Sequence, residues 1–339
     1  MNIEELEKEL KENQLNSIYL FYGDEQFLLE SSVKKIKKIF GELVQGINYI
    51  QIDETNIEGI IPNMETPAFG FEKKLIIVKN TGLLLKDGKR KNVKLVEQRE
   101  KLAKYLTEND EYIKETLVLI FIEESADKND LFKAIEKNGT ICNFERQKMP
   151  QLIKRIKAIC NAYKVKIDDT TAKYFIECCG TNMQDLINEI RKLIEYAGEN
   201  GEITKQSIDL LSIKQIESVI FDLTDNLGKK EIDKSLTILN NLIYNKEPVQ
   251  KILITLYNHF KKIYITKLAI EQDRNLTEAL NLKPNQIFLT SKYKIQAGYF
   301  TTQELKDIIN EFIMLDRNYK KGLIDINIGL ESILCRYCG

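Results

Sequence analysis

The sequence predicts an α/β domain built on a parallel sheet, followed by a small helical domain and an all-helical C-terminal domain. Short apolar runs rich in β-branched and aromatic residues alternate with helical patterns in the first half of the 339 residues. After Pro150 strand patterns become scarce, and from Ile213 onward the apolar residues recur with helical spacing. We expect domains at residues 1–148, 149–211 and 212–339.

The first predicted strand, residues 18–22, ends at Gly23, and a helical pattern follows at once. One apolar face of that helix consists of Leu28, Leu29, Val33, Ile36 and Ile39. In a P-loop enzyme, such a strand–glycine–helix corner binds phosphate through backbone amides and a lysine. Leu29 and Glu30 stand where the lysine and the following Ser or Thr would be needed. Because a carboxylate repels a triphosphate, we expect no nucleotide and no cofactor at this corner.

The other strands of the predicted sheet fall at residues 48–53, 75–78, 117–122 and 140–144. Helical patterns separate them: a short one begins at Ile57, and two longer ones cover residues 96–106 and 130–137. Apolar strands with intervening helices are typical of a parallel sheet that is covered on both faces.

The second half of the chain carries amphipathic helical stripes. The first two consist of Leu152, Ile153, Ile156 and Ile159, and of Leu186, Ile187, Ile190, Leu193 and Ile194. A break at residues 196–201 ends the small helical domain. Thr301 and Glu304 then form a predicted capping box. Behind it lies an apolar face of Leu305, Ile308, Ile309, Phe312 and Leu315.

The composition is that of a soluble globular protein, with 43% hydrophobic and 30% charged residues. The 50 basic and 51 acidic residues nearly cancel, so contact with nucleic acid or membrane would depend on local patches. No apolar stretch approaches a membrane span, and the start of the chain lacks the pattern of a secretory signal. The six scattered cysteines favour reduced thiols, so we expect a cytoplasmic protein.

Residues that could catalyse a reaction or bind a metal are few. His259 is the single histidine, and its helical pattern favours a structural or surface role over catalysis. Cys335 and Cys338 have the spacing of a zinc ligand pair, but no further ligands are suitably placed nearby. We expect neither a catalytic residue nor a metal site in this chain.

Two charged segments leave alternatives open. The strand at residues 117–122 ends in Glu123 and Glu124, as a magnesium-binding Walker B strand would. Without a P-loop lysine, a solvated strand end is favoured there. The basic run at residues 86–94 could contact a nucleic-acid backbone through Lys89, Arg90 and Lys91. It lacks aromatic residues for base stacking, which favours a solvated loop.

Residues 66–71, Thr-Pro-Ala-Phe-Gly-Phe, are the most suggestive segment for binding. Pro67 fixes a bend and Gly70 loosens the backbone after Phe69, so the aromatic side chains can project from a helix end or a loop. Core packing and docking to a partner remain equally open. An exposed phenylalanine would be a natural interface anchor.

Taken together, these segments resemble the delta subunit family of the bacterial DNA polymerase III clamp loader, over essentially the whole chain. Residues 19–28 are similar to the family's apolar–Gly–Asp–Glu–x–Phe–Leu start. Residues 67–70 lead into the strand at residues 75–78 as they do in the family, and Gly180 precedes a Glu-x-x-Lys-Leu helix. The third-domain pattern is matched by residues 291–297, residues 300–305, Asp316, Lys320 and Gly322.

The resemblance implies an AAA+-like domain with a degenerate P-loop at Gly23, a helical lid and a collar domain for oligomerisation. It implies a non-catalytic subunit of a DNA polymerase complex that binds and opens the sliding clamp for loading onto primed DNA. Carried over by position, the clamp contact is Ala68 and Phe69, with Phe71 as a supplement because alanine replaces a larger aliphatic residue. The implied partners are the clamp, the ATPase and delta-prime-type loader subunits, and primer–template DNA.

Two other classes of function remain open. One is an ATP-binding loader subunit or related AAA+ enzyme, against which Leu29 and Glu30 argue. The other is a helical scaffold unrelated to replication, which would associate with neither clamp nor loader.

Overall fold

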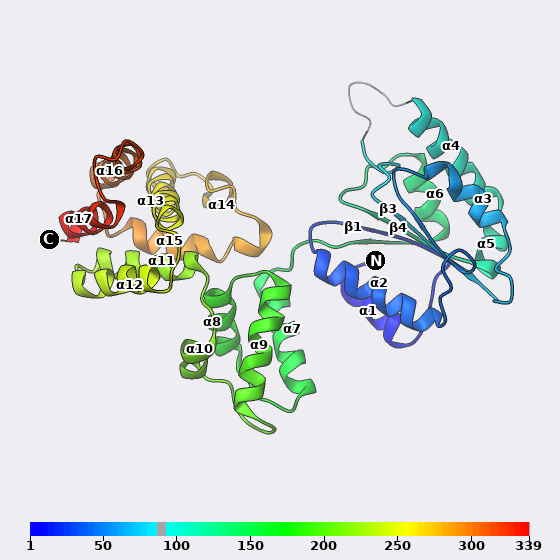
Figure 1. Ribbon diagram of the computed structural model, residues 1–339, viewed down its shortest axis with the longest axis horizontal. Helices are drawn as coiled ribbons and strands as arrows, with labels where there is room; N and C mark the ends of the chain where they lie inside the picture. The colour runs from blue at the N-terminus through cyan, green and yellow to red at the C-terminus, as the bar shows by residue number, and fades with distance from the viewer. Residues whose placement is uncertain (87–92, 339) are drawn as a thin grey trace. The chain divides into compact units, whose positions relative to one another are not determined.

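The computed structural model describes residues 1–86 and 93–338, which form two compact units (Figure 1). The first unit is Met1–Arg146 and the second begins at Gln147. The predicted domain boundaries after residues 148 and 211 stay predictions.

A five-stranded sheet forms the centre of the first unit. Its strands, in the spatial order β2-β3-β4-β1-β5, all pair in parallel. They are β1 (Ile18–Tyr22), β2 (Tyr49–Ile52), β3 (Lys74–Lys79), β4 (Leu117–Glu123) and β5 (Thr140–Asn143). The central pairs are apolar on both sides, with Leu20 opposite Phe121 and Ile76 opposite Leu119. The predicted parallel α/β sheet is confirmed.

Helices cover both faces of the sheet because successive strand residues point to opposite sides. One face, which includes Leu20, Ile76 and Phe121, packs on a group of helices that follows β2, β3 and β4. These are α3 (Ile60–Glu65, after the 3-10 turn η1, Ile57–Gly59), α4 (Val93–Glu108), α5 (Asp110–Thr116) and α6 (Asp130–Asn138). On the other side lie α1 (Ile3–Lys11) and α2 (Gln26–Phe40) (Figure 1).

The sequence patterns did not predict α1 or α5. For α1 the signal was present: the Asn2 side chain accepts from the Glu5 N–H, and the Glu5 carboxylate accepts from the Asn2 N–H, each at 2.9 Å. The buried residues of this helix, Ile3, Leu6 and Leu10, have helical spacing. A capping box followed by such a stripe is a sequence signature of a helix N-terminus.

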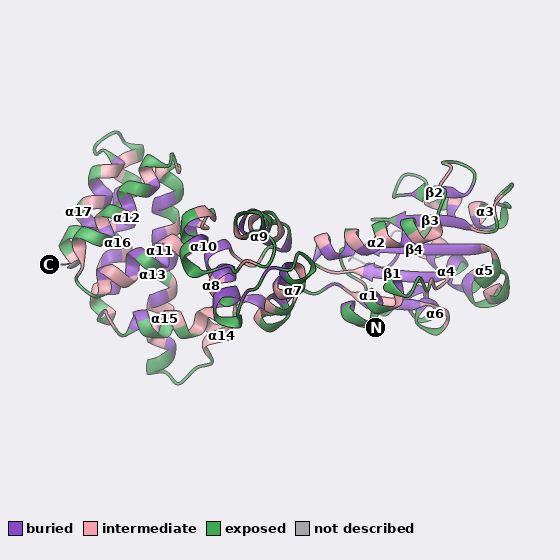
Figure 2. Cartoon of the chain, turned by 90° about the horizontal axis from the view of Figure 1, so that it is seen from below, coloured by how far each residue is buried: buried purple, intermediate pink, exposed green. Residues whose placement is uncertain are grey.

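The second unit consists of helices, as predicted. They are α7 (Met149–Ala162), α8 (Asp169–Cys179), α9 (Met183–Ala197), α10 (Lys205–Leu211), α11 (Ile216–Gly228), α12 (Ile232–Tyr244), α13 (Val249–Glu271), α14 (Leu276–Ala279), η2 (Pro284–Gln286), α15 (Leu289–Ala297), α16 (Thr302–Lys320) and α17 (Ile326–Cys338). The buried side chains of α11–α17 line the inside of this bundle (Figure 2). None of the described helices is long and apolar enough to span a membrane.

The predicted capping box of α16 is confirmed. The Thr301 side chain accepts from the Glu304 N–H at 3.1 Å, and the Glu304 carboxylate accepts from the Thr301 N–H at 2.6 Å. The stripe behind it is buried at Leu305, Ile308, Phe312 and Leu315. Phe312 lies 5.7 Å, centroid to centroid, from Phe260 of α13, so the face predicted from spacing is the face that packs.

Candidate functional site

The connection between β1 and α2 is short. Gly23, Asp24 and Glu25 alone separate the two elements, and we call them the Gly23 corner. The Gly23 N–H donates to the Glu124 carbonyl at 3.2 Å, and the Gly23 carbonyl accepts from Gln26 Nε2 at 2.9 Å. A P-loop needs about eight residues to surround a phosphate with N–H groups. The Gly23 corner is too short to do so.

Gly23 is required here by the backbone and by the space around it. Its φ is +122°, a conformation that L side chains rarely adopt. A Cβ at this position would lie 2.6 Å from the carbonyl oxygen of Phe144, which already accepts from the Glu25 N–H at 2.8 Å. Leu29 is buried and Glu30 is exposed, so neither presents a phosphate-binding group.

Glu123 corrects one sequence-based interpretation. It was expected, with Glu124, to be a solvated strand end, but its side chain is only 3% exposed. Its Oε1 accepts from the Thr81 N–H, the Thr81 hydroxyl and the Gly82 N–H at 2.8–3.0 Å. Burial raises the pKa of this carboxyl, although the three hydrogen bonds oppose the shift. Glu123 therefore ties the loop after β3 to the end of β4, and only Glu124 is exposed.

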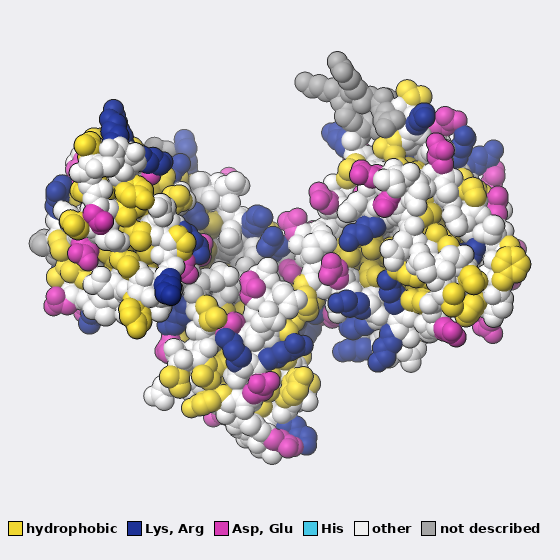
Figure 3. Space-filling model, viewed as in Figure 1, with side chains coloured by type: hydrophobic (Ala, Val, Ile, Leu, Met, Phe, Trp, Pro, Cys, Tyr) yellow, Lys and Arg dark blue, Asp and Glu magenta, His cyan; other side chains and the backbone are white. Residues whose placement is uncertain are grey.

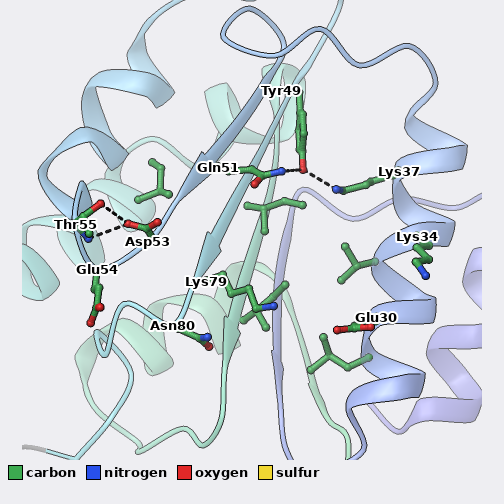
Figure 4. A pocket seen from close by; sticks show the side chains of 15 residues that line it. Glu30, Lys34, Lys37, Tyr49, Gln51, Asp53, Glu54, Thr55, Lys79 and Asn80 are labelled. Atoms are coloured by element: carbon green, nitrogen blue, oxygen red, sulfur yellow. Dashed lines mark hydrogen bonds between the residues drawn. The ribbon is translucent and has the colours of Figure 1, made fainter. Parts of the chain in front are cut away.

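A pocket of about 580 Å³ lies on the α2 face of the sheet, beside β2 and β3 (Figure 4). Lys37 Nζ donates to the Tyr49 hydroxyl at 2.6 Å and lies 4.6 Å from the ring centroid. The Thr55 hydroxyl and N–H donate to Asp53 and lower the pKa of its carboxyl. The charged lining residues are Lys34, Lys37, Lys79, Glu30, Asp53 and Glu54. Because these charges cancel, the pocket offers no net attraction to a polyphosphate.

Residues 66–71 leave α3 and turn back toward β3. The Phe71 N–H donates to the Ala68 carbonyl at 2.7 Å, and Gly70 has a φ of +83°. A four-residue turn with positive φ at its third residue favours glycine at that place. We call residues 68–71 the Phe69 turn.

The residues of the Phe69 turn differ in their exposure to solvent. The Phe69 side chain is 76% exposed, whereas Ala68 and Phe71 are half-buried. Phe71 lines a hollow of about 420 Å³ whose other apolar walls are Leu15, Ile39, Phe40 and Val118. Of the two readings left open by the sequence, core packing does not apply to Phe69. The roles of Ala68, Phe69 and Phe71 in binding stay predictions.

Two side chains from other elements hold the end of α3. Lys74 of β3 donates from Nζ to the Asn63 carbonyl (2.9 Å), the Thr66 carbonyl (2.6 Å) and the Thr66 hydroxyl (2.8 Å). Tyr112 of α5 donates to the Met64 carbonyl at 3.1 Å. Neither residue was predicted as part of the site. For Lys74 the sequence signal was a lysine at the start of an apolar strand. For Tyr112 there was no local signal, because it lies far along the chain from α3.

The predicted nucleic-acid contacts Lys89, Arg90 and Lys91 lie outside the described residues, and that role stays a prediction. On the face shown in Figure 3, Lys and Arg side chains gather on the part of the first unit where α1 and α2 lie, whereas over the second unit basic and acidic side chains are mixed. Within the described part of the chain, no group of three or more His, Cys, Asp or Glu could hold a metal ion.

His259 lies in the core of the second unit, consistent with a structural role. Gln296 Nε2 donates to Phe221 O and to Asp225 Oδ1, so Gln296 Oε1 is the acceptor for His259 Nε2–H at 2.7 Å. Burial lowers the pKa of the imidazole to about 3. The ring also packs edge-on against Phe221, with centroids 4.4 Å apart. The histidine is neutral and packed.

Comparisons with known proteins agree over the whole chain. The curated DNA polymerase III subunit delta of Bacillus subtilis is 25% identical over 334 residues, covering 96% of this chain and 94% of the relative. The probable DNA polymerase III subunit delta of Aquifex aeolicus is 26% identical over 312 residues, covering 88% and 85%. The structure of the Bacillus subtilis DNA clamp loader delta protein (YqeN) matches with a TM-score of 0.73 at 24% identity, covering 99% of both chains.

Two family models match separate parts of the sequence. Residues 19–145 match the model described as DNA polymerase III, delta subunit. Residues 217–337 match the model of the C-terminal domain of the same subunit. Between them the two matches span more than two thirds of the chain, and they include the Gly23 corner and the Phe69 turn. The chain therefore belongs to the delta subunit family of DNA polymerase III.

Proposed function

We propose that this chain is the clamp-loader subunit that binds the sliding clamp and opens it, so that the clamp can be loaded onto primed DNA during replication. Membership of the delta family supports a place in the loader. The 76% exposure of Phe69 supports the clamp contact. That exposure is the observation on which the proposal chiefly rests.

An exposed aromatic residue on a closed turn is suited to enter a pocket on a partner. Removing a phenylalanine side chain from water contributes about 1.5–3 kcal/mol. The turn is closed by its own hydrogen bond between Ala68 and Phe71, so little backbone freedom remains to be lost on binding. Ala68 adds little apolar area, and the half-buried Phe71 supplies a flank beside it.

Opening the clamp follows from differential binding. A wedge that fits the clamp better when the clamp's interface is distorted shifts the population toward the open ring. Such work needs no chemistry in this chain. Free energy from ATP would enter through the other subunits of the loader.

The Gly23 corner supports a subunit without ATPase activity of its own, because its short connection offers no cradle of N–H groups. The runner-up function is an ATP-binding loader subunit or related AAA+ enzyme. Isothermal titration of the isolated chain with Mg·ATP distinguishes the two. We expect no saturable binding, and stoichiometric binding would favour the runner-up.

The remaining partners follow from the same proposal. The α11–α17 bundle would contact the ATPase and delta-prime-type subunits of the loader as a collar. It carries exposed apolar side chains, among them Tyr244, Leu323 and Ile328, that such an interface could cover. Primer–template DNA would be contacted within the complex, with Lys89, Arg90 and Lys91 as candidates.

The proposal is tested by titrating the isolated chain with the cognate sliding clamp. Phe69→Ala is expected to weaken binding by about 2 kcal/mol or more, as removal of a buried aromatic anchor does. Tyr196→Ala is the matched control, since Tyr196 is an aromatic residue that is 62% exposed at the end of α9 in the other unit. Equal affinities for wild type and Phe69→Ala would refute the assignment of the clamp contact.

A further inference from the structure

The helix that leads into the Phe69 turn is too short to hold its own position. α3 has 6 residues, and isolated helices of fewer than about 12 residues are marginal in water. Two of its residues, Ile60 and Met64, lie one turn apart and are buried in the core under the sheet. These two side chains fix the body of the helix. The end from which the turn departs needs other contacts.

Lys74 makes those contacts from the first residue of β3. Side chains alternate along a strand, so Lys74 lies on the same face of the sheet as Ile76 and Val78, which is the face covered by α3. The side chain is 2% exposed, and its ammonium makes its three hydrogen bonds to Asn63 and Thr66. The last carbonyls of a helix lack intrahelical donors and carry partial negative charge. A cation placed there satisfies them.

Burying an ammonium group costs free energy, which shows in the lowered pKa of Lys74. An apolar residue at this strand position would avoid that cost. The lysine is accounted for by what it binds: two carbonyls and one hydroxyl at the place where the chain leaves α3. Thr66, which accepts two of the three bonds, lies three residues before Phe69.

We propose that Lys74 is the positioning residue of the clamp contact, holding Thr66 so that the Phe69 turn is formed before it meets the clamp. This inference rests on the function proposed above and adds to it the device that presents the aromatic side chain. A turn that is formed in advance loses less conformational freedom on binding than one that must be ordered by its partner.

The first test compares clamp binding by Lys74→Met with that by Lys73→Met. Lys73 is the matched control because it is the adjacent lysine and donates at 2.8 Å to Lys114 O of α5, not to a carbonyl of α3. We expect Lys74→Met to raise the Kd about tenfold through lost pre-organisation, and Lys73→Met to leave it within about twofold of wild type. Lys74→Arg, which keeps the charge and the donors, should recover part of the affinity.

A second variant, Thr66→Val, tests the same contact with less risk of unfolding the protein. Thr66 is exposed, and its substitution removes one acceptor of Lys74 without changing a core residue. It should weaken clamp binding in the same direction as Lys74→Met, by a smaller factor. A double-mutant cycle with Phe69→Ala then separates positioning from destabilisation. If Lys74 acts through Phe69, Lys74→Met costs little further affinity once Phe69 is alanine. Additive losses would overturn the proposal.

A readout without the clamp keeps this inference separate from the proposed function. The Phe71 N–H, which donates to Ala68, should exchange with solvent faster in Lys74→Met than in wild type or Lys73→Met, as measured by NMR on the isolated chain. Unchanged exchange would contradict positioning by Lys74, whatever the clamp does. Faster exchange, combined with no effect of Phe69→Ala on clamp affinity, would support positioning and refute the proposed clamp contact.

Discussion

At the carboxyl edge of the sheet the backbone of the Gly23 corner packs against Phe144, whereas at the amino edge the Phe69 turn directs an aromatic side chain into solvent. Each lies in a short connection between a strand and a helix of the first unit. A Cβ added at Gly23 would lie 2.6 Å from the carbonyl oxygen of Phe144, which is a clash, whereas a Cβ added at Gly70 would have no neighbouring atom within 4 Å. In this chain the corner that binds phosphate in P-loop proteins is too short to surround one, and the opposite edge carries the exposed Phe69 side chain, which we propose as the binding element.

The largest effect that this comparison predicts is on stability, at Gly23. Gly23→Ala should lower the unfolding free energy of the first unit by about 3 kcal/mol, because a strained φ and a backbone clash add together. Hydrogen exchange of the β1 amides reports this unit without the other. A loss below about 1 kcal/mol would mean that the backbone around Gly23 relaxes to accept a methyl group.

Gly70→Ala should lower the unfolding free energy less than Gly23→Ala does, but it should weaken clamp binding more. Its φ of +83° makes alanine unfavourable by about 1 kcal/mol, while the open space around it avoids any clash. We expect clamp binding to weaken several-fold, because the strained turn tilts Phe69. Gly322→Ala is the matched control: its φ is +71° and its surroundings are also open, but it lies in the second unit. Equal clamp affinities for the two variants would argue against a binding role for the turn.

The smallest effect is a pH dependence at Glu123. Its folded-state pKa is raised, so the folded state holds the proton more readily and stability falls as pH rises from the unfolded pKa through the folded one. Glu123→Gln keeps an acceptor for Thr81 and Gly82 but cannot ionise. The stability of the wild type relative to Glu123→Gln should therefore decrease from about pH 4 upward. A difference that does not vary with pH would show that the carboxyl is not buried as described.

Local patterns predicted most of the fold. The five strands and the helix after Gly23 are evident because short apolar runs and helical spacing are properties of neighbouring residues. The helix α1 was missed although Asn2 and Glu5 signalled it. The helix α5, with buried Ile113 alone on its inner side, lacked a stripe to recognise.

The site was predicted only in part, because its remaining features depend on residues far apart in the sequence. Phe69 and Gly70 could be chosen from their own segment. Glu123 was misread because its donors lie at Thr81 and Gly82 on a neighbouring loop. The contact of Tyr112 with Met64 likewise joins residues 48 positions apart, a pairing that no local pattern encodes.

The hydrogen bond from Phe71 to Ala68 makes the Phe69 turn a local structure: four consecutive residues close it, with Gly70 supplying the positive φ. Under the proposed function, a small cyclic peptide that closes Ala-Phe-Gly-Phe in the same turn would present the same aromatic group and compete with the whole subunit for the clamp. The Phe69 turn, which Lys74 holds in place in the whole chain, would then serve as a template for an inhibitor of replication.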